Sequence, residues 1–367
     1  MFRINLLPAR YGDSLWIEYG NPARPRWVLI DGGLASTYDA LKARLARTLP
    51  SQRRFDLLAV THVDADHIEG MVTLLADRNL AFSADDVWFN AWRHFSPAPR
   101  SLLGPVQGEF LSALIDRRRL NWNKSFADPG FYYSPAAIGA GDLPEVTLDG
   151  GMKITLLAPD RTALEKLKRS WKRAVQKAGI EAGNLPAWEA RLSETPRLLP
   201  KSLLGAEGTR LEALARAESG QDHSVANGSS LAFLAEYDGK AVLFAGDAPP
   251  GILVASLGRL LQKRRLDRLT LDAFKVSHHG GSKNTTLELV EILDCQLYLF
   301  STNGERFGHP DRGTVARILT ARGAPCRLVF NYRSPANTAW DEPDLKAAYR
   351  YETCYPAGNE QGSSVEL

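Results

Sequence analysis

The sequence predicts a mixed α/β protein in which short strands alternate with helices. Near its start, three apolar runs bounded by turn residues indicate strands, and residues 38–49 place apolar residues at helical spacing. Farther along, Asp238-Gly239 separates two apolar runs, which is typical of a β-hairpin. Two strand-then-helix units follow. The expected strands are 2–7, 14–19, 27–30, 55–60, 231–237, 241–245, 272–277 and 296–300, and the last two helices are 285–293 and 314–321.

Composition places the chain among ordinary globular proteins. It has 367 residues, of which 44% are hydrophobic and 24% charged, so it can bury one large core or two average ones. The formal net charge of +3 suits an anionic partner, but it is too small for a dedicated nucleic-acid-binding composition.

Cysteine usage and hydropathy predict the compartment. Cys295, Cys326 and Cys354 show no CxxC spacing, and an odd number gives no disulfide framework. The apolar run at residues 1–8 is too short for an export signal, and no stretch approaches the roughly 18 apolar residues of a membrane span. We therefore expect a cytoplasmic protein.

Residues 81–225 differ in character from the flanking regions. They carry aromatic residues among Pro, Gly and Ser, then a basic helical segment at 161–180, which indicates an insertion. The basic segment is either a solvated helix face or an anion-attracting surface. Beyond residue 333, residues 349–355 can add a strand, and the chain from Ala357 is expected to be flexible.

The densest group of reactive side chains stands at 61–67, where Thr-His-Val-Asp-Ala-Asp-His ends a predicted strand. Two imidazoles and two carboxylates in six positions can hold metal ions, with His62 and Asp64 on one ion and Asp66 and His67 on a second. Chance clustering of solvated polar residues is the alternative.

Two further groups also stand at strand ends. Asp247 closes 242–246, and His278-His279 closes 274–277. Considered alone, Asp247 would be a turn residue or helix cap, and each histidine a surface residue. Together with the 62–67 cluster they indicate a metal site with two ions.

These motifs resemble the metallo-β-lactamase superfamily and, within it, the soluble hydrolase domain of ComEC-type proteins. The resemblance covers about residues 1–80 and 225–332. It rests on Leu-Ile-Asp-Gly-Gly at 29–33, the 62–67 cluster, Asn-Gly-Ser-Ser-Leu at 227–231, Gly246-Asp247, Lys-Val-Ser-His-His-Gly at 275–280 and Phe-Gly-His-Pro at 307–310.

The resemblance implies a four-layer αββα sandwich with a two-metal site along one edge. It predicts one domain at 1–332, with an insertion at about 81–225 and a C-terminal extension at 333–367. The implied metal ligands are His62, Asp64, Asp66, His67, Asp247 and His278, with Asp247 bridging the ions.

The chain departs from the commonest superfamily pattern at Asp64, where a third histidine is usual, and at Asn227, near an expected histidine ligand. An oxygen-richer ligand set shifts preference from Zn²⁺ toward Mn²⁺, although Zn²⁺ remains open. His223 could supply the missing nitrogen ligand or be a structural loop histidine.

Other residues receive supporting roles in this hypothesis. Asp66, His279 and His309 are candidate catalytic residues. His278, which directly ends its strand, is preferred over His279 as the metal ligand, and His279 would face substrate or lie outside the coordination sphere. Asp31 would orient a ligand, and His309 would stabilise negative charge or hold phosphate beside Ser301. Ser282, Lys283 and Asn303 are candidate substrate contacts.

The leading functional hypothesis is a hydrolase that uses a metal-bridged hydroxide as a phosphodiesterase or nuclease on DNA or another nucleic acid. Trp88, Trp92, Trp122, Tyr132 and Tyr133 could stack bases, although tryptophans in a large domain more often belong to the core. One alternative is a hydrolase of small esters, thioesters, lactones or cyclic nucleotides, with the insertion as a lid. Another is a non-catalytic binding module. The sequence leaves the oligomeric state open.

Overall fold

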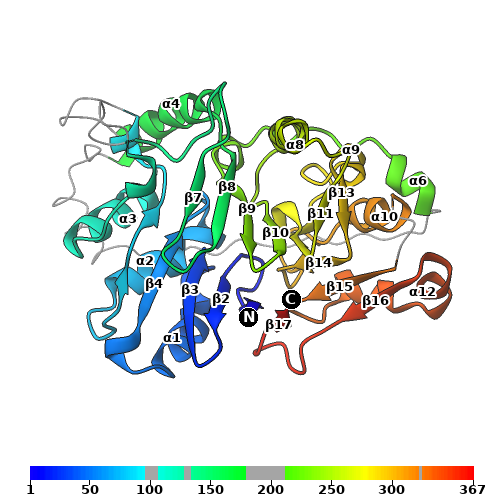
Figure 1. Cartoon of the computed structure of the whole chain (residues 1–367), viewed down its shortest axis with the longest axis horizontal. Helices are drawn as coiled ribbons and strands as arrows, with labels where there is room; N and C mark the ends of the chain where they lie inside the picture. Colours follow the sequence, from blue (N-terminus) through cyan, green and yellow to red (C-terminus); the bar gives the residue numbers. More distant parts are fainter. Residues whose placement is uncertain (96–105, 128–133, 179–210, 322–324) are drawn as a thin grey trace.

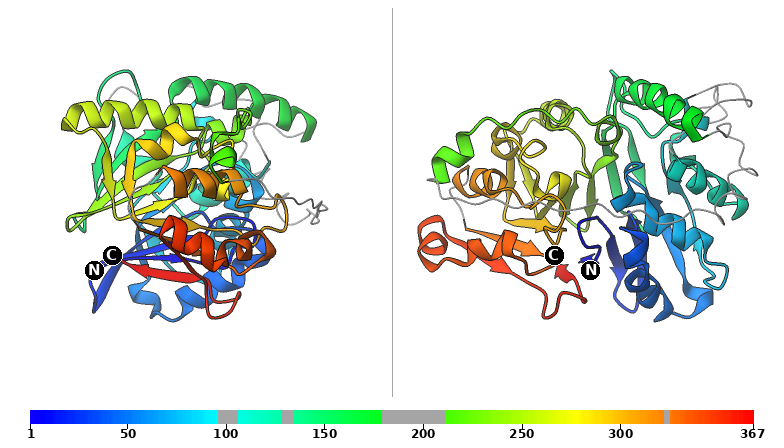
Figure 2. Two further views of the ribbon diagram at one scale, coloured as in Figure 1. Left: turned by 90° about the vertical axis from the view of Figure 1, so that its right-hand side faces the viewer. Right: turned by 180° about the vertical axis from the view of Figure 1, so that it is seen from behind.

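Two β-sheets packed face to face form the centre of the molecule in the computed structural model, which describes residues 1–95, 106–127, 134–178, 211–321 and 325–367 (Figure 1). Helices cover the outer faces of both sheets, as all three views show (Figure 2). None of the helices in these ranges is long and apolar enough to cross a membrane.

The first sheet contains seven strands of the described chain and holds both ends of the protein. Its order is β17-β1-β2-β3-β4-β5, and β6 also pairs with β4. The bounds are β1 Phe2–Leu6, β2 Leu15–Asn21, β3 Arg24–Ile30, β4 Arg54–Ala59, β5 Ser83–Ala84, β6 Val87–Trp88 and β17 Ser363–Glu366.

The second sheet contains eight described strands in the order β16-β15-β14-β12-β10-β9-β8-β7. The bounds are β7 Glu145–Thr147, β8 Lys153–Ala158, β9 Ala232–Tyr237, β10 Lys240–Phe244, β12 Ala273–Lys275, β14 Leu297–Phe300, β15 Cys326–Phe330 and β16 Tyr351–Cys354. A separate pair joins β11 Leu269–Leu271 to β13 Leu293–Cys295.

Alternation along the strands creates the layers. In β3, Val28 and Ile30 face the core shared with the second sheet, whereas Trp27 and Leu29 pack under the outer helices. The predicted αββα sandwich is confirmed.

The helices are α1 Tyr38–Ala46, α2 Ala65–Ala76, α3 Val106–Arg117, α4 Arg161–Ala178, α6 Leu211–Arg216, α7 Val225–Gly228, α8 Pro250–Arg264, α9 Leu287–Glu291, α10 Arg312–Thr320, α11 Pro335–Thr338 and α12 Pro343–Tyr349.

The region predicted as an insertion contributes strands to the sandwich itself. β5 and β6 pair with β4, and β8 pairs antiparallel with β9. Trp88 is fully buried against Phe233 and Phe126, so it serves the core and not base stacking. Tyr132 and Tyr133 lie outside the described residues.

The C-terminal extension also completes both sheets. β16 pairs with β15, which agrees with the strand expected at 349–355. The expectation that the chain from Ala357 is flexible is wrong for β17, because this strand pairs antiparallel with β1. Backbone hydrogen bonds to β1 hold it in the sheet, whereas its alternating polar residues gave no sequence signal.

Candidate metal centre

Parallel strands bring the candidate ligands to one edge of the sandwich. β3 and β4 are parallel, as are β10, β12 and β14. The carboxyl ends of parallel strands meet at one edge of a sheet, so His62 after β4, Asp247 after β10 and the His278-His279 pair after β12 converge. His62, Asp247 and His279 are almost completely buried there.

Helix α2 carries Asp66 and His67 to the same place because two glycines permit close packing. A β-carbon at Gly70 would overlap the carbonyl oxygen of Gly32, and one at Gly32 would overlap the backbone of Met71. The loop after β3 therefore lies directly on the helix. Asp31 in that loop contacts His67 Nδ1 through Oδ2 at 2.8 Å.

Three of the converging residues have left-handed backbone conformations. The φ angles are 58° at Asp31, 48° at His278 and 55° at His279. Such angles are uncommon for residues other than glycine and cost free energy that the surrounding structure must supply. Their concentration at one edge is typical of a functional site.

Asp247 Oδ2 lies at the centre of the cluster. Four imidazole nitrogens surround it: His67 Nε2 at 3.4 Å, His278 Nε2 at 3.6 Å, His62 Nε2 at 3.7 Å and His279 Nε2 at 3.9 Å. The Nε2 atoms of His67 and His279 lie 3.3 Å apart, and Asp66 Oδ2 is 3.5 Å from His279 Nε2.

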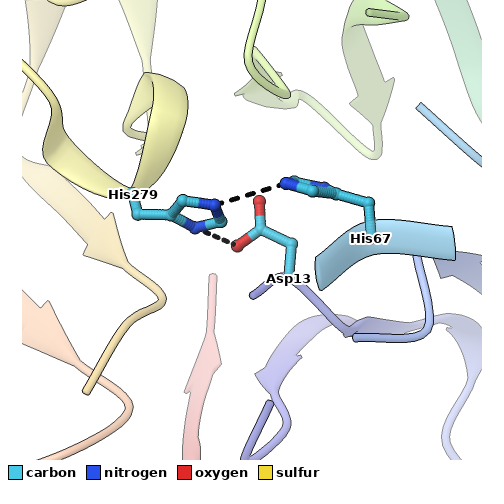
Figure 3. A group of neighbouring side chains, drawn as sticks. All are labelled: Asp13, His67 and His279. Carbon is cyan, nitrogen blue, oxygen red and sulfur yellow. Dashed lines mark hydrogen bonds and ion pairs between the residues drawn. The ribbon is translucent and has the colours of Figure 1, made fainter. Parts of the chain in front are cut away.

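Hydrogen bonds at the opposite ring nitrogens fix how His67 and His279 are protonated. His67 Nδ1 donates to Asp31, which can only accept. His279 Nδ1 lies 2.9 Å from the carbonyl oxygen of Ser301, which can only accept. Asp13 Oδ1, a second acceptor, lies 3.2 Å from the same nitrogen (Figure 3). Each Nδ1 therefore carries a hydrogen, which leaves each Nε2, facing Asp247, as the nitrogen that can bind a proton or a cation.

His62 and His278 also have a hydrogen-bond acceptor at Nδ1. Thr61 Oγ1 donates to Asp31, so it accepts from His62 Nδ1 at 3.0 Å. Asn284 uses its amide nitrogen on Asp222, which leaves Oδ1 to accept from His278 Nδ1 at 2.9 Å. Four Nε2 atoms, each able to bind a proton or a cation, thus face one carboxylate.

This arrangement fits metal cations. Converging lone pairs repel unless a positive charge lies among them, and His62 Nε2 and Asp247 Oδ1 are buried without a hydrogen-bond partner in the described chain. Two nitrogen ligands at 2.0–2.1 Å from a tetrahedral ion lie about 3.3–3.4 Å apart, which matches the distance between His67 and His279. Two overlapping triads have the spacing of a cation site, His62-His67-Asp247 and Asp13-His67-His279. In the second triad, Asp13 faces His279 Nδ1, which carries a hydrogen, so its carboxylate lies behind the ring and not among the converging Nε2 atoms.

Charge coupling in the cluster also indicates a site built for positive charge. Burial alone lowers the pKa of His279, but Asp13 and Asp247 outweigh it and raise the pKa to about 9. Burial likewise opposes protonation of His67, yet Asp247 and Asp31 raise its pKa well above the usual range. In the absence of cations the site therefore holds protons in their place.

The two neighbouring histidines occupy different surroundings. The side chain of His278 is 23% exposed, whereas that of His279 is 1% exposed beside Asp66 and His67. The position of His278 directly after its strand predicts it to be the ligand. Because both Nε2 atoms approach Asp247, we count both histidines as candidate ligands. Asp64 is more open, with Oδ2 3.6 Å from His62 Nε2.

Asn227 and His223 differ sharply in position. Asn227 is buried, its Nδ2 donates to Asp222 Oδ2 at 2.7 Å, and its Oδ1 has no hydrogen-bond partner among the described residues. That oxygen is therefore available to a cation. His223 is exposed, whereas Asp222 contacts the cluster through Asn227 and lies 3.7 Å from His278 Nδ1.

His309 lies next to the cluster, with its ring centroid 5.5 Å from that of His278. Its Nδ1 is 2.9 Å from Asp311 Oδ1, and Asp311 Oδ2 accepts from the backbone of Ser282. Lys283 is exposed. Asn303 uses its side-chain oxygen on the backbone of Glu305, and its backbone N–H donates to Arg10.

Asp13 and Lys275 lie beside the centre but are not among the functional residues predicted from the sequence. Lys275 Nζ lies 2.8 Å from Asp13 Oδ2, and both side chains are buried. A signal existed, because Lys275 interrupts an apolar strand and a lysine inside such a strand needs a buried partner. The sequence did not identify that partner, which lies more than 260 positions away.

Neither a protein-family model nor a curated protein sequence matches the chain. Several solved structures do match the chain, and metallo-β-lactamase-fold proteins are among them. YhfI from Bacillus subtilis, described as such a protein, is 8% identical, with 100% of each chain covered and a TM-score of 0.38. Zn²⁺-bound PqqB from Methylobacterium extorquens is 12% identical, with 96% of this chain and 87% of that chain covered and a TM-score of 0.35.

CmlA from Streptomyces venezuelae, described as a diiron β-hydroxylase, is also similar. The identity is 12%, 100% of this chain is covered, and the TM-score is 0.40. The chain spans about half the length of CmlA, since 54% of that protein is covered. The activities in these descriptions belong to those proteins and are not transferred to this chain.

Proposed function

We propose that this protein is a metal-dependent phosphodiesterase that cleaves nucleic acid with two divalent cations, Zn²⁺ or Mn²⁺. The observation that carries the proposal is the ring of four imidazole Nε2 atoms around Asp247 Oδ2. A carboxylate between two groups of nitrogen ligands is suited to bridging two cations.

Bound cations would lower the pKa of a water molecule and neutralise charge on the phosphodiester. The protein's own residues hold the ligands in place for this chemistry. Asp31 orients His67 directly and His62 through Thr61. Asp31, Thr61, His62 and His67 are all buried. Because water is excluded around these side chains, the electrostatic interactions between them are stronger.

The pair of His309 and Asp311 supports action on a phosphate ester. Asp311 accepts at His309 Nδ1, so the carboxylate orients the ring and favours a hydrogen on that nitrogen. When both ring nitrogens are protonated, Nε2 can donate to a phosphate oxygen or to the leaving oxygen. His309 is placed for this role because its side chain is 12% exposed beside His278.

An aromatic and cationic rim beside the centre supports a nucleic-acid substrate. Phe307 is 51% exposed, and its ring centroid lies 5.7 Å from that of His309. The Arg306 guanidinium stacks between Phe307 and Tyr11, at 4.9 and 5.3 Å from their rings. Exposed rings stack bases and guanidinium groups bind phosphates. The sequence also resembles ComEC-type hydrolase domains, a branch associated with nuclease function, and this supports the same substrate class.

The proposal is tested with protein stripped of metal and reloaded with Mn²⁺ or Zn²⁺. We expect cleavage of single- or double-stranded DNA and its loss in Asp247→Asn. Glu291→Gln, an exposed change on α9 purified in parallel, should retain cleavage. Equal cleavage by Asp247→Asn would reveal a contaminating nuclease. If the protein hydrolyses only small esters or lactones, it is a small-molecule hydrolase and the nuclease proposal is wrong.

A further inference from the structure

We infer that Asp13 and Lys275 form a buried ion pair whose role is to position His279 for cation binding. The inference rests on the proposed metal centre. Lys275 Nζ and Asp13 Oδ2 are 2.8 Å apart, and their side chains are 1% and 2% exposed. An ion pair so deeply buried costs desolvation free energy, so its place beside a ligand indicates a function beyond stability.

Asp13 contacts the ring nitrogen of His279 that faces away from the cluster. Its Oδ1 lies 3.2 Å from His279 Nδ1, while Nε2 of the same ring lies 3.3 Å from His67 Nε2 (Figure 3). Because the carboxylate meets the far side of the imidazole, Asp13 is a positioning residue and not a ligand. The Ser301 carbonyl accepts from the same nitrogen at 2.9 Å, and the negative charge of Asp13 adds to it in favouring a hydrogen on Nδ1 and in holding the orientation of the ring.

The pair of Asp31 and His67 shows what Lys275 adds. Asp31 Oδ1 accepts from the Thr61 backbone, and its Oδ2 accepts from Thr61 Oγ1, each at 2.7 Å. Asp13 has Lys275 instead, whose full charge compensates its own. In both pairs the carboxylate orients an imidazole. The charge of buried Asp13, however, is compensated by the Lys275 ammonium, without which the buried carboxylate would destabilise the folded protein.

The loop that carries Asp13 also contacts two of the elements that position the centre, α2 and the end of β14. Its backbone N–H donates to the Asp66 carbonyl at 3.1 Å, and the carbonyl of Gly12 accepts from Ser301 Oγ at 2.9 Å. A β-carbon at Gly12 would overlap the Asp66 carbonyl oxygen. The loop between β1 and β2 thus lies against the start of α2 and the end of β14.

The test compares Asp13→Asn, Lys275→Met and the double variant by calorimetric titration of metal-free protein with Zn²⁺ and Mn²⁺. We expect Asp13→Asn to weaken binding of the affected cation about 10- to 100-fold. Lys275→Met should unfold at lower denaturant concentration, because it leaves a buried carboxylate uncompensated. The double variant should recover stability but not affinity.

Asp56→Asn is the matched control. Asp56 is a buried carboxylate paired with Arg26 at the opposite end of β4 from His62, so its loss should lower stability and leave cation affinity unchanged. Wild-type affinity in the double variant would overturn the inference. So would saturation of Asp13→Asn with one cation fewer, since Asp13 would then be a ligand.

The two proposals fail in distinguishable ways. If the wild-type protein binds two cations but cleaves no nucleic acid, the proposed substrate is wrong, and the affinity comparison still decides the role of Asp13. If the wild-type protein binds no cation, the metal centre is wrong and the inference about Asp13 fails with it.

Discussion

Gly32 donates its backbone N–H to the carbonyl oxygen of His67 at 2.9 Å, which fixes the loop after β3 to the first turn of α2. Gly33 accepts from the N–H of Gly70 at 2.8 Å in the same contact. This close approach holds Asp31 against His67, so the centre depends on glycines as much as on its ligands.

Gly70→Ala should therefore damage both stability and cation binding. The added methyl group would overlap the Gly32 carbonyl oxygen, and overpacking of this kind costs about 1–3 kcal/mol. Chemical denaturation and cation titration would measure the two effects. Gly258→Ala in α8 is the control: its β-carbon would meet open space, so the free energy of unfolding should rise by up to about 1 kcal/mol.

Asp31→Asn should weaken cation binding about 10- to 100-fold without unfolding the protein. Asparagine tolerates the left-handed backbone at this position, with φ of 58°. Its amide nitrogen, however, replaces one of the two accepting oxygens. It would face a donor, either the Thr61 N–H or the pair Thr61 Oγ1 and His67 Nδ1, and the negative charge that holds the hydrogen on His67 Nδ1 is lost. Titration calorimetry checks this, and an unchanged affinity would remove Asp31 from the positioning role.

Cation binding should release protons and weaken as pH falls. The carboxylates raise the pKa of His279 to about 9 and that of His67 well above its usual range, so at neutral pH the metal-free site holds protons that a cation must displace. Titrations in buffers of different ionisation enthalpy give the number released. A heat that is independent of the buffer would contradict the predicted exchange.

Phe307→Ala should lower the affinity for single-stranded oligonucleotides while leaving turnover of a small chromogenic phosphodiester nearly unchanged. Stacking of a base on an aromatic ring contributes about 1–3 kcal/mol, and Phe307 is exposed next to His309. Fluorescence anisotropy measures the affinity. Equal losses on both substrates would mean that Phe307 supports His309 and does not contact a base.

His94 should make the metal-free protein less stable in acid. Burial, with a contribution from Arg93, lowers its pKa to about 3, against about 6.5 in an unfolded chain. Between these values the unfolded state binds the extra proton. The contribution of His94 to the free energy of unfolding thus falls by about 1.4 kcal/mol per pH unit as pH drops below 6.5.

His94→Asn isolates this effect, because Asn can still accept from the Ala91 N–H that now donates to His94 Nδ1. Urea denaturation in the presence of a chelator at pH 7.5, 6.5 and 5.5 should show a shallower loss of stability in the variant. Parallel curves for the two proteins would show that His94 is protonated equally in both states.

The sequence by itself determined the strand ends and their chemistry. Apolar runs that stop at His62, Asp247 and His278 place reactive side chains where backbone hydrogen bonding ends, and this pattern is local. The αββα sandwich was implied by the family resemblance that these motifs carry, and it is observed. Asp31, placed beside the ligands by the same reasoning, does contact His67.

Tertiary structure alone decided which partners meet. The choice between His278 and His279 depended on two left-handed residues in succession, which turn both rings toward Asp247. Asp13 and β17 were not found from sequence because each acquires its role through a contact with a distant segment, Lys275 and β1 respectively. Periodicity reports which face of an element is buried, but it carries no information about what that face touches.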